Sequence, residues 1–131
     1  MNAGSSAWIE MLRGTGSSID PRLQQAMRPD ESLLMPEVVY REVLQGAANP
    51  QQFVRLQNRL DPVAPFDPED AMELARAAAL LYARCRWQGV TLRSPNDCLI
   101  AACAIESGEP LLHADRDFLT LARIDQRLQL L

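Results

Sequence analysis

The chain has 131 residues, a formal net charge of −4 at neutral pH, 47% hydrophobic residues and 23% charged residues. These values are typical of a soluble globular protein, and the length suits one domain spanning residues 1–131. The negative charge argues against a broadly basic nucleic-acid coat but leaves room for a local patch of arginine, which supplies every basic residue.

No stretch approaches the roughly 20 apolar residues of a membrane span, and residues 1–6 lack the hydrophobic run of a signal peptide. Three cysteines, Cys85, Cys98 and Cys103, show no C-x-x-C spacing, and two of them lie on apolar helical faces. Buried thiols of this kind behave as small hydrophobic residues. We therefore expect a reduced cytoplasmic protein that does not enter a membrane.

Short apolar runs alternate with longer helical stretches along the chain. Residues 1–4 are a weak beginning, and residues 7–12 suggest a short strand leading into a helix, followed by a loop at 14–18. Strands are then expected at 33–35, 63–66, 111–113 and 128–130, and helices at 20–27, 36–46, 50–60, 67–89, 94–108 and 118–124. The apolar strands do not alternate with polar residues, which is typical of parallel strands covered on both faces. The predicted fold is α/β, a short, mostly parallel sheet sandwiched between helices.

Acidic residues gather where such a fold places its ligand sites. Asp115 and Asp117 follow the predicted strand 111–113, and the carboxyl ends of strands in open α/β sheets carry ligand sites. Asp97 lies in the first turn of the helix before that strand. Glu42 falls within the apolar stripe of the helix 36–46, where a carboxylate must be paired or bind a cation. Crowded carboxylates resist ionisation unless a cation compensates them, and an all-oxygen site favours Mg²⁺ or Mn²⁺.

Each of these residues also has an ordinary structural explanation. Asp97 fits a capping box with Ser94, and Asp115 or Asp117 could cap the helix that follows them. Glu42 could form a buried ion pair with an arginine. The single histidine, His113, is better explained as a core residue than as a ligand. A D-x-D turn also occurs in metal-dependent transferases, but the chain offers no signal for a nucleotide-sugar pocket.

Four motifs follow one another along the chain: S-S-A-W-I-E-x-L-R-G at 5–14, P-E-V-V-x-x-E-V-L-x-G at 36–46, T-x-R-S-x-x-D-C-L-I-A-A at 91–102 and L-L-H-A-D-R-D-F at 111–118. In this order they resemble the motifs of the VapC toxins, the PIN-domain ribonucleases of bacterial toxin–antitoxin pairs. The resemblance covers nearly the whole chain. It implies a PIN-domain fold and a Mg²⁺-dependent endoribonuclease that cuts structured RNA, tRNA or rRNA, with Mn²⁺ as a possible substitute.

The resemblance also implies roles for individual residues and partners. The cation would hold the scissile phosphate and activate a water, leaving 5′-phosphate and 3′-hydroxyl ends. The matching positions are Glu42, Asp97 and Asp115 for metal binding, Asp117 as a further catalytic carboxylate, Ser6 at the edge of the pocket, and Arg93, then Arg41, Arg84, Arg86 and Arg116, for RNA phosphates. The implied partners are a VapB-type antitoxin and a second copy of the chain in a homodimer.

One position departs from the family pattern. The family's first motif begins with an aspartate at the end of the first strand, and Gly4 stands there instead, after residues 1–3 that have little apolar character. Glycine offers no side-chain ligand, so metal binding should be weaker and activity low. The alternative function is a catalytically impaired PIN domain that binds antitoxin or RNA without cutting.

Overall fold

The computed structural model describes residues 1–13, 19–26 and 33–131, and within them one parallel sheet lies between two layers of helices. Its four strands, in the spatial order β3-β2-β1-β4, are β1 (Asn2–Ala3), β2 (Leu34–Met35), β3 (Ala64–Pro65) and β4 (Leu111–Leu112). Every pairing between them is parallel, which confirms the predicted α/β fold. None of the helices in these ranges is long and apolar enough to cross a membrane.

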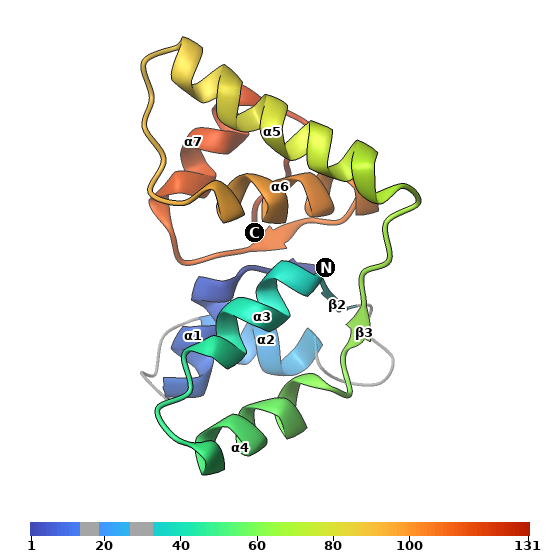
Figure 1. The fold of residues 1–131 in the computed structure, drawn as a ribbon, viewed down its shortest axis with the longest axis vertical. Coiled ribbons are helices and arrows are strands. Elements are labelled where there is room, and N and C mark those ends of the chain that lie inside the picture. Colours follow the sequence, from blue (N-terminus) through green and yellow to red (C-terminus); the bar gives the residue numbers. More distant parts are fainter. Residues whose placement is uncertain (14–18, 27–32) are drawn as a thin grey trace.

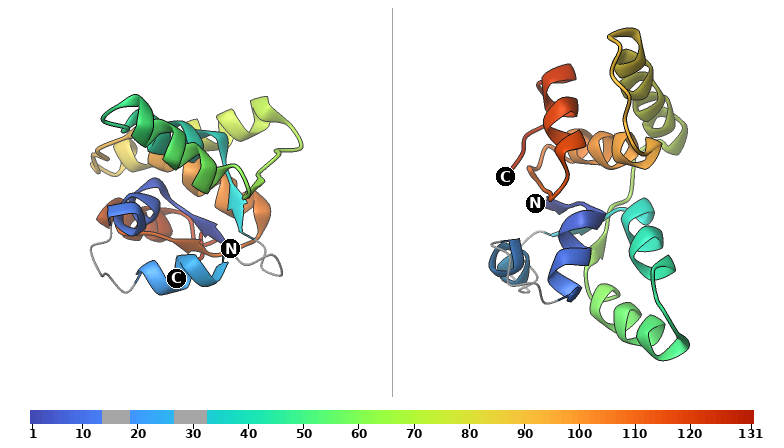
Figure 2. Two further views of the ribbon diagram at one scale, coloured as in Figure 1. Left: turned by 90° about the horizontal axis from the view of Figure 1, so that it is seen from below. Right: turned by 90° about the vertical axis from the view of Figure 1, so that its left-hand side faces the viewer.

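The helices form one layer on each face of the sheet, and both views of Figure 2 show the strands between them. One layer contains α1 (Ser5–Arg13), α2 (Ile19–Ala26) and α7 (Arg116–Ile124). The other contains α3 (Glu37–Gln45), α4 (Pro50–Leu60), α5 (Ala71–Trp87) and α6 (Pro95–Ser107). Along the sheet, α5, α6 and α7 form the upper half of the molecule in Figure 1, and α1 to α4 form the lower half.

The central strand β1 is the element that the sequence did not predict. It pairs with β2 on one side and with β4 on the other, so it joins the two halves of the sheet. Asn2 hides it, because a polar residue interrupts what would be an apolar run. The Asn2 amide is buried and donates to Ser107 Oγ at 2.9 Å and to the Glu109 carbonyl at 3.3 Å. These bonds satisfy the N–H groups of the amide, whereas its Oδ1 is buried without a hydrogen-bond partner within the described residues.

The helix that carries Asp97 forms for the reasons that its sequence indicates. Ser94 caps α6 by accepting the Asn96 N–H at 3.2 Å, and Pro95 occupies the first helical position. Gly108 ends the helix in the left-handed conformation, with φ of +69°, which glycine adopts without strain. The helix is buried along most of its length, as its uniformly apolar composition predicts.

Three predicted boundaries are wrong. Residues 7–12 contain no strand, because α1 already begins at Ser5 and the strand β1 lies before it. The helix predicted from Asp67 begins at Ala71, because the Asp70 carboxylate is the one that accepts the first free N–H groups. The predicted final strand is reduced to one bridge between Leu130 and Leu111. The predicted loop 14–18 and the end of the helix 20–27 lie outside the described residues.

The core is continuous through the sheet and both helical layers. Its largest fully buried side chains include Trp8, Phe118, Leu23, Leu60 and Ile100. The three cysteines are buried and free, and burial raises the pKa of Cys98 and of Cys103 to about 12. Thiols with such pKa values stay protonated and pack as small apolar groups, as the sequence suggested.

Helix α7 offers a direct test of where this core ends. Leu121 is 1% exposed and Leu119, two residues earlier on the same helix, is 51% exposed. Leu121→Ala should lower the free energy of unfolding by about 2–5 kcal/mol, because it leaves a cavity in the core. Leu119→Ala should change it by no more than about 0.5 kcal/mol. Urea unfolding followed by circular dichroism measures both, and equal losses would contradict this assignment of the core.

Candidate metal centre

The parallel pairing of β1 with β4 brings the candidate residues to one edge of the sheet. Ala3 is in register with Leu112, and the Gly4 N–H donates to the Leu112 carbonyl at 2.9 Å. The chain then enters α1 after β1 and reaches Asp115 after β4. In Figure 1 this edge lies between α6 and α7 above and α1 and α3 below. Strand ends in this arrangement form the usual ligand site of an open α/β sheet.

Three aspartates meet at this edge. Asp97, Asp115 and Asp117 each place a carboxylate oxygen within 4.8 Å of the other two. Asp97 comes from the first turn of α6, and the other two come from the start of α7. The sequence therefore predicted correctly that these carboxylates converge.

The Asp97 carboxylate carries the strongest electrostatic penalty. Burial raises its pKa to about 7, and the charges of Asp115, Asp117 and Glu42 add to that rise, against a smaller lowering by Arg93. Within the described ranges no hydrogen bond reaches this carboxylate, so the predicted capping box lacks its return bond to Ser94. A cation beside Asp97 would relieve both burial and repulsion.

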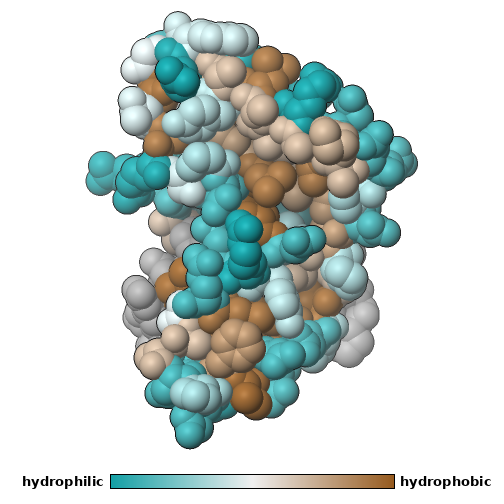
Figure 3. Space-filling model, viewed as in Figure 1, coloured by the Kyte–Doolittle hydropathy of each residue, from teal (hydrophilic) through white to brown (hydrophobic). Residues whose placement is uncertain are grey.

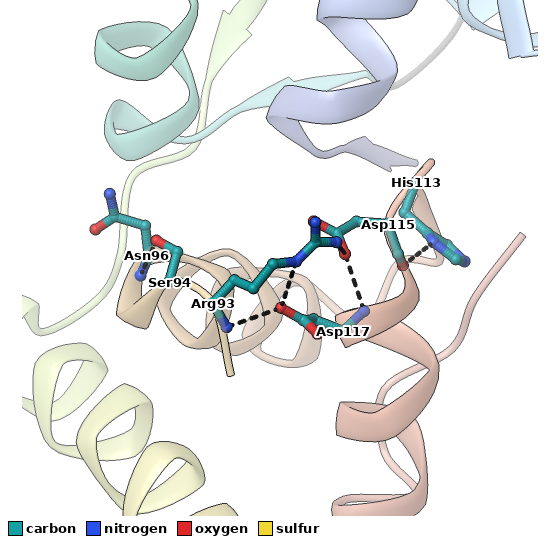
Figure 4. A network of polar contacts seen from close by, with 6 residues as sticks. All are labelled: Arg93, Ser94, Asn96, His113, Asp115 and Asp117. Atoms are coloured by element: carbon teal, nitrogen blue, oxygen red, sulfur yellow. Dashed lines mark hydrogen bonds and ion pairs between the residues drawn. The ribbon is translucent and has the colours of Figure 1, made fainter. Parts of the chain in front are cut away.

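The carboxylates of Asp115 and Asp117 accept several hydrogen bonds. Asp115 caps α7, as one of the ordinary explanations predicted, by accepting the Asp117 N–H at 3.0 Å. Arg93 Nη2 donates to Asp115 Oδ1 at 2.8 Å, and the Arg93 backbone N–H donates to Asp117 Oδ2 at 3.1 Å. Figure 4 shows the Arg93 side chain reaching from the segment before α6 across to both carboxylates.

Glu42 faces the same region from α3 and lies outside the close group of three aspartates. Its Oε1 accepts the Ser5 hydroxyl at 2.7 Å, and its Oε2 accepts the Asn96 amide at 3.4 Å. Among the described residues no arginine pairs with it, so the predicted ion pair is not observed. Ser5 and Asn96 had no predicted role, although Ser5 follows Gly4 and Asn96 precedes Asp97 within motifs that resemble those of the VapC toxins.

Gly4 is buried and carries the backbone into this edge. A Cβ atom built on it would lie 3.6 Å from the Phe118 ring and 3.8 Å from the Leu112 carbonyl, both ordinary van der Waals distances. Its φ is not positive, so a side chain at this position needs no strained backbone. The structure therefore has room for a Cβ atom at the position where the resemblance to VapC toxins implies an aspartate.

The remaining predicted residues lie at different distances from the aspartates. The side chain of Ser6 lies outside the described part of the structure. Arg116 is exposed at the start of α7, Arg86 is exposed in the last turn of α5, and Arg41 is exposed on α3. Arg84 points to the other end of α7, where it bonds the Ile124 carbonyl and lies 3.7 Å from Asp125. Of these five arginines, only Arg93 forms an ion pair with Asp115 or Asp117 in the described part of the structure.

His113 plays a structural part, as its sequence context predicted. Its Nδ1 lies 3.0 Å from the Asp115 carbonyl, and its ring packs on Phe118 with centroids 5.7 Å apart. It supports the turn between β4 and α7 from behind. The donor set at this edge therefore consists of carboxylate oxygens, which suit a hard divalent cation such as Mg²⁺.

Comparison with known proteins agrees with this geometry. Residues 5–124 match the family described as PIN domain. The chain therefore belongs to the PIN-domain family.

Within that family its relatives include VapC proteins. It is 36% identical over 121 residues to Ribonuclease VapC11 of Mycobacterium tuberculosis, strain H37Rv, an alignment that covers 92% of this chain and 90% of that protein. The same values hold for VapC ribonuclease Mb1587 of Mycobacterium bovis.

Solved structures share the fold at lower sequence identity. VapBC-1 from nontypeable Haemophilus influenzae matches with a TM-score of 0.76 and 19% identity, over 99% of this chain and 95% of that one. VapBC2 from Rickettsia felis, bound to a DNA fragment from its promoter, matches with a TM-score of 0.71 and 18% identity, over 99% and 96% of the two chains. At these identities the likeness concerns the fold.

The raised pKa of Asp97 predicts how stability depends on pH in EDTA. The folded protein binds this proton more tightly than the unfolded chain, whose aspartates have a pKa of about 3.9. Protonation of Asp97 therefore stabilises the folded protein fully at low pH, and this contribution is lost as the pH rises through about 7. Asp97→Asn keeps a neutral group, so its melting temperature should exceed that of the unchanged protein at pH 8 and match it near pH 4. A difference that is the same at both pH values would contradict the assignment.

Proposed function

We propose that this protein is the ribonuclease toxin of a toxin–antitoxin pair and cuts structured RNA with a divalent cation. The observation that carries the proposal is the group of three carboxylates, Asp97, Asp115 and Asp117, at the carboxyl edge of a parallel sheet. The names of both mycobacterial relatives support it, because each is called a ribonuclease. The choice of tRNA or rRNA as substrate, the extent of the domain and a cytoplasmic location stay predictions from the sequence.

In this proposal Asp97, Asp115 and Asp117 hold Mg²⁺, or Mn²⁺ in its place. The bound cation would supply the positive charge that a scissile phosphate and an attacking water need. Asp97 is the residue that gains most from it, because its carboxylate is partly buried and lies among other acids. Glu42 completes the acidic set from α3, and Ser5 and Asn96 fix the direction of its carboxylate.

RNA would approach over the exposed arginines near this edge. Arg93 and Arg116 are exposed beside Asp115 and Asp117, and exposed guanidinium groups suit phosphate recognition. Arg41 on α3 and Arg86 on α5 are also exposed, and they form no ion pair with these carboxylates within the described structure. Arg84 is the weakest of the five candidates, because its guanidinium is occupied by Ile124 and Asp125.

An antitoxin would cover an apolar surface on the lower half of the molecule. Ile9, Leu12, Val43 and Leu56 line a pocket of about 150 Å³ formed by α1, α3 and α4, and Glu42 lies at its wall. On α4, Phe53 and Val54 are 42% and 53% exposed, and Figure 3 shows hydrophobic surface over this part of the molecule. VapBC complexes among the structural neighbours support a VapB-type partner, and the homodimer stays a prediction.

Gly4 supports a second candidate, a PIN domain that binds antitoxin or RNA without cutting. The missing carboxylate removes one ligand from the family's set, whereas Glu42, Asp97, Asp115 and Asp117 favour the enzyme. Space for a side chain at Gly4 makes the two candidates separable by one substitution.

The test is cleavage of a pool of tRNA and ribosomal RNA with Mg²⁺ or Mn²⁺, with EDTA as the metal-free control. We expect slow, EDTA-sensitive cutting by the unchanged chain. Gly4→Asp should raise the rate by at least about tenfold, because even indirect supporting residues of metal sites are worth ten- to hundredfold. Gly4→Asp/Asp97→Asn should return it to background.

Two results would count against the enzyme. Silence from all three proteins would favour the binding module, provided that circular dichroism shows them folded. Cutting that persists in EDTA, or in the double variant, would place the activity elsewhere than in the aspartate group.

A further inference from the structure

The guanidinium of Arg93 already lies among the carboxylates that would hold a cation. Its Nη2 is 2.8 Å from Asp115 Oδ1, and its Nε is 3.7 Å from Asp117 Oδ2. The Arg93 side chain is 73% exposed, whereas those of Asp115 and Asp117 are 22% and 15% exposed. The exposed guanidinium of Arg93 thus contacts two carboxylates that are largely shielded from solvent (Figure 4).

The contacts occupy one oxygen atom of each of the two carboxylates that would share a divalent cation. Asp115 Oδ1 accepts both the Arg93 guanidinium and the Asp117 N–H, which occupies its two lone pairs. Asp117 Oδ2 accepts the Arg93 backbone N–H. Asp97 accepts no hydrogen bond from a described residue. Arg93 therefore directly compensates the charges of Asp115 and Asp117, whereas the Asp97 carboxylate is still repelled by its acidic neighbours.

Two separate groups of Arg93 do different work. The backbone N–H ties the segment before α6 to Asp117 whatever the side chain does. The guanidinium is exposed and is held by one hydrogen bond to Asp115 and an ion pair with Asp117, so little packing fixes it and salt screens its attraction. The side chain can therefore leave the carboxylates without moving the backbone.

We propose that Arg93 is an internal counter-cation that competes with the divalent cation for Asp115 and Asp117. When the cation binds, the guanidinium is released toward solvent at the mouth of the site, where it is placed to bind an RNA phosphate. Arg93 is in this sense a positioning residue that couples the two ligands. The inference rests on the proposed function, since it needs a divalent cation at this site.

Linkage gives the coupling a direction. A cation that frees Arg93 raises the affinity for phosphate, and phosphate that captures Arg93 raises the affinity for the cation by the same factor. Without RNA, therefore, the guanidinium holds metal affinity down. A purely structural Arg93 would do the opposite, because its removal would loosen the aspartates and weaken metal binding.

The experiment is calorimetric titration of Mn²⁺ into the full chain without RNA, both with the sequence unchanged and in the Gly4→Asp background. We expect Arg93→Gln to tighten Mn²⁺ binding about three- to tenfold, the effect of removing one nearby positive charge from a partly exposed site. Arg93→Lys keeps the positive charge but loses the planar guanidinium, so its Mn²⁺ affinity should lie between those of the unchanged chain and Arg93→Gln. The matched control is Arg76→Gln, which removes another exposed arginine from an ion pair, 3.0 Å from Glu73 on α5, and should leave the affinity unchanged.

A second measurement follows the side chain itself. In the ¹⁵N spectrum of arginine side chains, the Arg93 Nε signal should shift as Mg²⁺ is added, and the Arg76 signal should not. RNA cleavage at saturating Mg²⁺ should be slower in Arg93→Gln despite its tighter metal binding, a combination that lost structure would not produce.

Unchanged or weaker Mn²⁺ binding by Arg93→Gln, with the melting temperature preserved, would overturn the competition. Failure of every protein to bind Mn²⁺, including Gly4→Asp and the Arg76→Gln control, would instead overturn the metal site and the proposed function with it. The two failures are thus distinguishable.

Discussion

The pairing of β1 between β2 and β4 is the constraint on which the candidate site depends. It aligns the end of β1 with the end of β4, so that Gly4 and Asp115 emerge at the same edge of the sheet. The helical layer that contains α3 and α6 then brings Glu42 and Asp97 to that edge. Because the strands are only two residues long, a few hydrogen bonds fix this alignment, and the buried apolar side chains around them keep it in place. The acidic group is therefore held together by the core beneath it, against its own repulsion.

Sequence reasoning could locate the acidic group because local signals and helical periodicity carried it. Ser94 and Pro95 mark the start of α6 and Gly108 marks its end, and this start places Asp97 in the first turn. The inward direction of Glu42 followed from the apolar residues around it. Neither inference needed long-range contacts, which is why both agree with the structure.

The sequence could not show which residues that are distant along the chain contact one another in the fold. Asn2 reads as polar and unsuited to a central strand until Ser107 and Glu109 are seen beside it. Asp67 was predicted to start the long helix, and only the folded backbone shows that the same residue type three positions later, Asp70, caps it instead. In the same way, Ser5 and Asn96 gain their role from Glu42, far away in the chain but adjacent in space.

The edges of the sheet carry a consequence for how other proteins can attach. On one side, β3 contains Pro65, which has no N–H to offer a neighbouring strand. On the other side, the end of the chain covers β4, since Leu111 donates to the Gln129 carbonyl and accepts from the Leu131 N–H. An exposed edge strand can pair with a strand of another chain and extend the sheet. Here Pro65 hinders such pairing at one edge, and the covering C-terminal residues hinder it at the other. Proteins that bind this one are thereby directed to its helical surfaces, where side-chain shape and charge, rather than backbone hydrogen bonds, select the partner.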